Sequence, residues 1–322
     1  MKFYKIKIRL YNILFNFYFF LTSHTAYRKI NGLSLYRIYR IKYPTYEKSG
    51  QAVHSSIIKL STSLFIMVFT PYPNTDDKFE NPSIVISKNG ITFKEEKKHL
   101  NPLVPTPSID HNDDPDFFIT ENKLYNIIYL ETLRPDFQNL CLLRSYDRIS
   151  WERTVLFTQK LHQNDNFMLS PTYVKKDETF LFFVNKKQNN MLQLEYVKGK
   201  DLFSIDFQNS NILIVQNLKY TPWHLSILTY SQGYIMLLTV VSGDLRNGTY
   251  SLITAYSEDL ISWKTNNKII LDNCYRSSGF IIDDTIYIYA SKIFKFKNTR
   301  QKWKLCLYKI KLSDVFLSEN EL

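Results

Sequence analysis

One phrase decides the fold, and the chain carries it three times: Ser87-Lys88-Asn89-Gly90-Ile91-Thr92-Phe93, Ser145-Tyr146-Asp147-Arg148-Ile149-Ser150-Trp151 and Ser257-Glu258-Asp259-Leu260-Ile261-Ser262-Trp263. The shared form is Ser-x-Asp-x-Ile-x-Trp, and a degenerate copy runs from Gly199 to Ile205 in the gap that the spacing leaves. Asp or Asn closes a tight turn by bonding nearby backbone. The apolar and aromatic residues that follow begin a half-buried strand. The phrase therefore predicts a repeated hairpin turn.

The turn belongs to a unit of roughly 50 to 60 residues that recurs five times as four short strands, a period typical of propellers and solenoids. The second strand of each unit is its most hydrophobic, and short polar turns such as Asp283-Asp284 suit antiparallel hairpins. This pattern predicts an all-β fold, a five-bladed β-propeller of four-stranded antiparallel blades, which removes most sheet edges. We assign residues 51–322 to the propeller, with 315–317 as its last strand, and residues 1–50 to an N-terminal extension.

Composition supports a sheet protein and gives little sign of nucleic-acid binding. Tyr and Phe number 23 each against only 8 Gly, and aromatic side chains fit pleated, half-buried surfaces. The formal net charge is +11, but Lys and Arg are spread along the chain without a clustered stripe. We therefore do not expect a nucleic-acid partner. A solvated basic surface explains the charge most simply, and an acidic glycan is the alternative partner.

No metal or cofactor is expected from the spacing of possible ligands. The three cysteines, Cys141, Cys274 and Cys306, include no Cys-x-x-Cys pair, so neither a zinc site nor a disulfide framework is indicated. No phosphate-binding loop, dinucleotide fingerprint or nucleophile elbow is present. A Ca²⁺ ion held in the central channel by carboxylates and waters is the one alternative.

The first 50 residues leave two interpretations open. Basic residues precede an aromatic-rich run from Tyr11 to Leu21, which resembles a signal peptide or an anchor. The run is interrupted by Asn12 and Asn16 and is too short to span a bilayer. A secreted or membrane-anchored protein is one expectation, and an extra strand in a cytoplasmic protein is the other.

The functional site is expected where the first strands of the blades begin, because these strands line the central channel of a propeller. Residues at their heads converge although they are far apart in the sequence. A purely structural repeat would carry similar residues there, but these are polar and unlike one another: His54, Asp114, Ser170, His224 and Arg276. This contrast predicts a binding or catalytic site in the channel.

The blade openings resemble those of five-bladed propeller glycosidases, the arabinanase and β-xylosidase clan and its levanase and invertase relatives, over roughly residues 50 to 315. The phrases that carry the resemblance are Glu80-Asn81-Pro82-Ser83, Asp114-Pro115-Asp116, Ser170-Pro171, Trp223-His224 and Tyr275-Arg276-Ser277-Ser278. In that clan three carboxylates from the first three blades hydrolyse a glycosidic bond. The resemblance thus implies carboxylate acid/base chemistry in the channel.

Glu80 and Asp114 are the expected acid and base. The sequence departs from the clan in two places, because His54 stands where the first blade usually carries Asp, and the third blade opens with Ser170 and offers no Glu. The expected substrate contacts are His54, Asn81, Asp116, Ser170, Trp223, His224, Tyr275 and Arg276. Trp151 and Trp263, by their repeat position, are expected to pack the blades.

Three functions follow as alternatives. The first is a glycoside hydrolase, or a related glycan-active enzyme, acting on an oligo- or polysaccharide. The second is a propeller that binds a glycan without turning it over, and the third is a scaffold for another protein. A sialidase is disfavoured, because the turn phrase lacks the extra Gly-x step of the sialidase Asp box and only Arg276 stands at a strand head.

Overall fold

The predicted five-bladed propeller is confirmed. The computed structural model describes residues 28–30, 33–35, 39–98, 100–161, 167–187, 191–243, 245, 248–294 and 301–316, and the expectation for the run from Tyr11 to Leu21 falls outside them. From the first blade to the fifth, the strands are, innermost first, β4 (Ala52–Ser61), β5 (Leu64–Pro71), β6 (Ser83–Ser87) and β7 (Phe93–Lys94); β8 (His111–Ile119), β9 (Tyr125–Leu133), β10 (Phe137–Ser145) and β11 (Glu152–Lys160); β12 (Phe167–Lys175), β13 (Thr179–Lys186), β14 (Leu192–Gly199) and β15 (Asn211–Ile212); β17 (Thr221–Tyr230), β18 (Gly233–Ser242), β19 (Thr249–Ser257) and β20 (Trp263–Thr265); and β22 (Cys274–Ile282), β23 (Thr285–Phe294), β24 (Lys302–Lys311) and β3 (Tyr39–Arg40).

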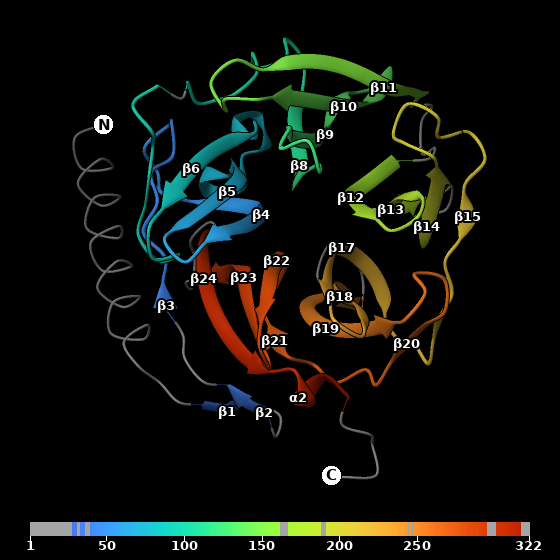
Figure 1. Ribbon diagram of the computed structural model, residues 1–322. Coiled ribbons are helices and arrows are strands. Elements are labelled where there is room, and N and C mark those ends of the chain that lie inside the picture. The colour runs from blue at the N-terminus through green and yellow to red at the C-terminus, as the bar shows by residue number, and fades with distance from the viewer. Residues whose placement is uncertain are drawn as a thin grey trace.

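The five blades stand around a common axis, and β4, β8, β12, β17 and β22 are the innermost strands (Figure 1). Two short strands extend the fourth blade: β16 (Val215–Gln216) pairs in parallel with β20, and β21 (Leu271–Asp272) pairs with β19. Strands β1 (Arg28–Ile30) and β2 (Leu33–Leu35) form a separate hairpin. Within the residues that the structure describes, no helix is long and apolar enough to cross a membrane.

The outer strand of the fifth blade comes from the N-terminal side of the chain. Strand β3 pairs with β24, so the ring is closed by joining the two ends of the described chain. The assignment of the last strand to residues 315–317 is wrong. Residues Ser313–Phe316 form a short helix, α2, and Val315 is buried against the fifth blade. Sequence reasoning missed β3 because a two-residue strand carries almost no periodic signal.

Apolar side chains hold neighbouring blades together. In β18 every residue from Tyr234 to Val241 is buried, because the sheet is covered by a blade on each side. The contact between the third and fourth blades centres on Phe182 and Trp263, whose rings meet edge to face with centroids 6.2 Å apart. The predicted packing role of Trp263 is therefore seen in the structure.

The repeated phrase forms the same turn in all three copies. In the second blade the Oδ1 atom of Asp147 accepts hydrogen bonds from the backbone N–H groups of Ile149 and Ser150, at 2.8 and 2.9 Å. Asp259 and Asn89 do the same in their blades. The residue after each Asp or Asn has a positive φ, 70° at Gly90, 64° at Arg148 and 74° at Leu260. Only the first copy places there the glycine that such a backbone favours.

The innermost strands share a β-bulge near their first residues, and this positions the site. The register of the inner strand against the second strand shifts at 53/56, 113/116, 169/172, 222/224 and 274/277. A bulge bends a strand and re-aims one side chain. At three of these places the residue takes a left-handed backbone, with φ of 53° at His54, 49° at Asp114 and 52° at Ser170. Non-glycine residues in this region are strained, and such strain clusters at functional sites.

Candidate active site

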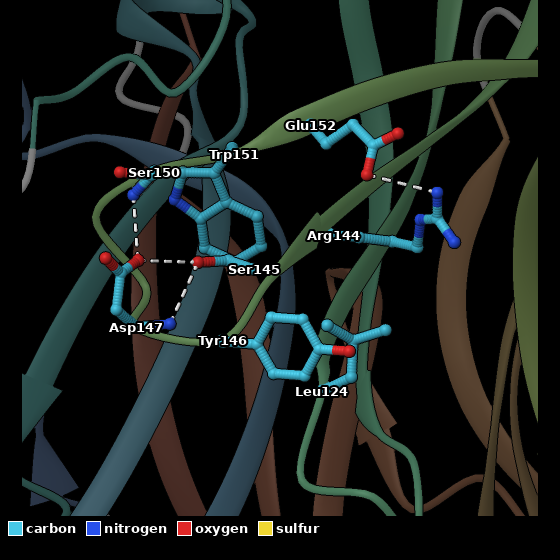
Figure 2. Close-up of a pocket in the computed structure, with 8 residues that line it drawn as sticks. All are labelled: Leu124, Arg144, Ser145, Tyr146, Asp147, Ser150, Trp151 and Glu152. Carbon is cyan, nitrogen blue, oxygen red and sulfur yellow. Dashed lines mark hydrogen bonds and ion pairs between the residues drawn. The ribbon is translucent and has the colours of Figure 1, made fainter.

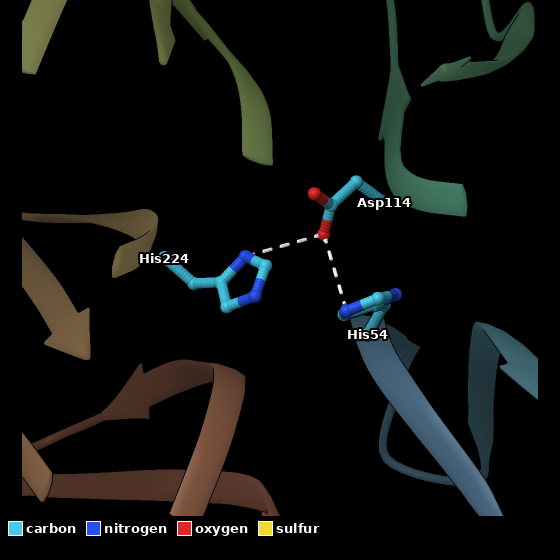
Figure 3. A group of neighbouring side chains, drawn as sticks. All are labelled: His54, Asp114 and His224. Atoms are coloured by element: carbon cyan, nitrogen blue, oxygen red, sulfur yellow. Dashed lines mark ion pairs between the residues drawn. The ribbon is translucent and has the colours of Figure 1, made fainter. Parts of the chain in front are cut away.

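Three bulge residues from three different blades gather at the channel axis (Figure 3). The Nε2 atom of His54 lies 3.5 Å from Oδ1 of Asp114, and the Nδ1 atom of His224 lies 3.4 Å from the same oxygen. All three side chains are at least 95% buried. Separations of this size are long for hydrogen bonds. They are close to the distance of about 3.4 Å between two ligands of one tetrahedral ion with bonds of about 2.1 Å.

Each of the three residues keeps one atom without a hydrogen-bond partner among the described residues: Nε2 of His54, Oδ1 of Asp114 and Nε2 of His224. Buried polar atoms are normally satisfied, so an unpaired set of this kind asks for an explanation. Two imidazole nitrogens and one carboxylate oxygen are also a common donor set for divalent transition metals. The three side chains could together hold one such ion.

The other nitrogen of each histidine is held by the protein. The Nδ1 atom of His54 lies 3.0 Å from Oε2 of Glu80 and 3.2 Å from the hydroxyl of Thr70. The Nδ1 atom of His224 lies 2.6 Å from the hydroxyl of Ser170. A carboxylate or hydroxyl on one nitrogen fixes the tautomer and turns the opposite nitrogen toward a metal. Glu80 therefore has the geometry of a residue that orients His54.

Electrostatics separates the two histidines. Burial lowers the pKa of His54, but the neighbouring carboxylates of Asp114 and Glu80 outweigh burial and raise it above its usual value. Burial, helped by the positive charges of His54 and Arg276, lowers the pKa of His224 to about 3, so that ring is neutral. For Asp114, burial opposes ionisation, yet His54, His224 and Arg276 hold its pKa at about 2. An anionic oxygen and a neutral imidazole are thus available at neutral pH.

Arg276 and Asp116 lie beneath this group, with protein partners of their own. Arg276 has no exposed surface. One Nη atom donates to the carbonyl of Pro115 at 2.9 Å and lies 3.7 Å from Asp114, and the other lies 3.5 Å from Asp116. Asp116 also accepts a hydrogen bond from the N–H of Tyr173. Both residues tie blades together below the site, where a substrate contact would require them to move.

Partly exposed aromatic rings lie beside the histidines. The ring of Tyr275 is 4.4 Å from that of His224 and 5.3 Å from that of His54, centroid to centroid. The Trp223 ring lies 5.4 Å from His224 on another side. Tyr250 and Trp303 extend this group, at 5.7 and 5.0 Å from Tyr275. These rings give the site an apolar wall suited to the face of a sugar.

Asn81 and Ser170 are both wholly buried, with different roles. Asn81 donates to the carbonyl of Val104 at 2.9 Å and so holds the loop after the first blade. The backbone N–H of Ser170 donates to Oδ2 of Asp114 at 2.8 Å. Ser170 therefore belongs to the central group, because it contacts both Asp114 and His224.

A second acidic group lies on the same face but already holds a cation. Asp77, Asp110 and His111 could offer three ligand atoms. Arg134 donates to both oxygens of Asp110, at 2.5 and 2.7 Å, and lies 3.4 Å from Asp77. His111 is further bound to Asp113 at 3.1 Å. The guanidinium thus occupies the place that an ion would take.

Sequence reasoning brought together most of the central group but expected no metal ligands. Metal motifs are recognised by short spacings, whereas these three ligand types stand on β4, β8 and β17. The contribution of Tyr250 and Trp303 was also missed. Both lie on third strands, β19 and β24, and the signal was topological, because a third strand starts at the same end of the blade as the first.

Comparisons with known proteins identify the fold but no family. No family model and no curated protein matches the sequence. Among solved structures, the chain is similar to an N-acetylgalactosamine deacetylase from F. plautii in complex with blood group B trisaccharide, with a TM-score of 0.75 at 16% identity over 88% of this chain and 97% of that one. It is also similar to an exo-1,5-α-L-arabinanase from a bovine ruminal metagenomic library, with a TM-score of 0.59 at 11% identity over 79% and 92%. A family 117 glycoside hydrolase from Zobellia galactanivorans gives 0.59 at 14% identity over 86% and 90%. The resemblance to five-bladed propeller glycosidases is thereby confirmed at the level of fold.

Proposed function

We propose that the protein is a hydrolase that acts on a carbohydrate and removes the N-acetyl group of an amino sugar with the help of a divalent metal ion. The observation that carries the proposal is the set of unpaired buried atoms on His54, Asp114 and His224. The fold similarity to an N-acetylgalactosamine deacetylase supports the choice of reaction. A bound ion would polarise the amide carbonyl and lower the pKa of a water molecule.

The residues of the chain then have separable tasks. His54, Asp114 and His224 would hold the ion, while Glu80 and Ser170 fix the orientation of the two imidazoles. The rings of Trp223 and Tyr275 would bind the sugar through its apolar face, and so exclude water from the reacting amide.

A second candidate function is glycoside hydrolysis with Glu80 and Asp114 as the carboxylate pair. The fold similarity to an arabinanase and to a family 117 glycoside hydrolase supports it. The geometry argues against it, because the imidazole of His54 lies between the two carboxylates, 3.0 Å from one and 3.5 Å from the other. A sugar and a water molecule need that space in a glycosidase.

One experiment separates the candidates. The protein is stripped with a chelator, reloaded with Zn²⁺, Mn²⁺ or Mg²⁺, and incubated with glycans that end in N-acetylgalactosamine or N-acetylglucosamine. We expect metal-dependent release of acetate, which Asp114→Asn abolishes and Asp147→Asn, at an exposed turn, leaves intact. Release of reducing sugar without metal would establish the glycosidase instead. Neither product from any glycan would contradict both enzymatic functions.

A further inference from the structure

A second pocket lies on the second blade, at the end of the strands opposite to the candidate active site (Figure 2). Asp114 is near the start of β8, whereas the pocket is formed by the β8–β9 turn and the β10–β11 turn. The strand from Asp114 to its last residue, Ile119, alone spans about 17 Å. The pocket has a volume of about 430 Å³, enough for one sugar residue. It is therefore separate from the channel.

The pocket opens at one copy of the repeated turn and not at an equivalent one. In the second blade Tyr146 is 74% exposed and Trp151 is partly exposed. At the same two positions the fourth blade has Glu258 and the wholly buried Trp263. The first blade carries Lys88 and a buried phenylalanine there. The turn itself does not require an exposed tyrosine, so the aromatic surface of this copy is a local addition.

Arg144 presents unused hydrogen-bond donors beside these rings. Its Nη2 atom lies 3.1 Å from Oε2 of Glu152, and its guanidinium lies over the ring of Phe203 at 5.2 Å. Its Nε atom is buried and has no hydrogen-bond partner within the described part of the chain. Two contacts therefore fix the plane of the guanidinium while several N–H groups stay available.

The charges of the pocket select the kind of ligand. Arg144 contributes one positive charge, and Asp147 and Glu152 contribute two negative ones. In the turn, Oδ1 of Asp147 takes the hydrogen bonds and leaves Oδ2 for another partner. An acidic ligand would meet a net negative wall. A neutral sugar would meet donors on Arg144, acceptors on Glu152 and Asp147, and an aromatic face on Tyr146.

We infer that this pocket is an accessory binding site for a neutral sugar residue of a polysaccharide, held between Tyr146 and the Arg144–Glu152 pair. The inference does not depend on the reaction in the channel. Its role would be to keep a long carbohydrate on the protein while another part of it reaches the opposite face.

Native affinity electrophoresis tests this site, with gels that contain arabinan, galactan, mannan, xyloglucan or dextran, and polygalacturonate as the acidic comparison. The Asp114→Asn protein serves as the parent, so that turnover does not remove the polymer. We expect at least one neutral polysaccharide to retard it. Tyr146→Ala and Arg144→Gln should each raise the apparent dissociation constant about tenfold, and Glu258→Ala, at the matching turn position, should leave it unchanged.

Three outcomes would overturn the inference: no retardation by any neutral polysaccharide, retardation by polygalacturonate alone, or retardation of Tyr146→Ala equal to that of Glu258→Ala. Because Tyr146 is exposed, its replacement leaves the fold intact, and a melting curve checks this for Arg144→Gln. Binding is read without acetate release. Failure of the deacetylase proposal would therefore leave this result unaffected, and the reverse also holds.

Discussion

Glu80 holds the imidazole of His54 at 3.0 Å through Nδ1, and this contact turns the opposite nitrogen toward Asp114 at 3.5 Å. The relationship assigns the two carboxylates different tasks. Asp114 faces the centre of the channel, where its Oδ1 atom has no hydrogen-bond partner among the described residues. Glu80 lies behind the histidine and also accepts a hydrogen bond from Thr70 at 2.9 Å.

Glu80→Gln should weaken metal binding and spare the chemistry. Removing a carboxylate that orients a ligating histidine typically lowers metal affinity by about 10–100-fold. We expect this loss in a calorimetric titration with Zn²⁺ or Mn²⁺, with near-normal acetate release once the metal is saturating. Glu195→Gln is the matched control, because Glu195 is equally buried but pairs with Lys187. Loss of all turnover at saturating metal would instead return Glu80 to the acid and base pair.

Arg276→Met should destabilise the propeller strongly. The guanidinium is the positive charge that lies closest to both Asp114 and Asp116 beneath the site, and removing one partner of a buried ionic group costs about 3–5 kcal/mol. Urea unfolding measures the loss, and Lys198→Gln, which breaks an exposed pair with Glu178, should leave the midpoint unchanged. Adding Asp116→Asn to Arg276→Met should restore part of the stability. No restoration would show that the lost hydrogen bonds to backbone carbonyls dominate.

The sequence predicted the ring of blades because the turn phrase depends on local hydrogen bonds that any copy can make alone. It also predicted that His54, Asp114, Ser170 and His224 converge, since topology alone places the heads of the first strands together. The pairing of β3 with β24 could not be predicted, because two residues at a distant end of the chain complete a blade. The metal ligands could not be recognised either. Their common feature is a set of lone pairs aimed at one point, which depends on the bulges and on Glu80 and Ser170 behind the rings.

Asp259→Asn should remove a part of the acid sensitivity without unfolding the turn. Hydrogen bonds from the backbone N–H groups of Ser262 and Ile261 outweigh burial and hold the pKa of Asp259 at about 2, below its usual 3.8. A depressed pKa stabilises the fold above pH 3.8 and loses that effect as the pH falls toward 2. The wild type should therefore exceed the variant in urea midpoint at pH 6 but not at pH 2. Asn89 makes the same hydrogen bonds in the first blade, so the variant should fold. A difference that persists at pH 2 would contradict this assignment.

Trp263→Ala and Trp151→Ala should differ, although both residues end the same phrase. Trp263 has no exposed surface and meets Phe182 across the boundary between the third and fourth blades, so its removal leaves a cavity. Such a truncation costs about 3–5 kcal/mol. Trp151 is partly exposed beside the second-blade pocket, and its loss removes less buried area. Urea unfolding of both variants measures the difference. Equal losses would mean that the hydrogen bond from each indole to its turn, from Trp263 to Leu260 and from Trp151 to Arg148, contributes more than the packing between blades.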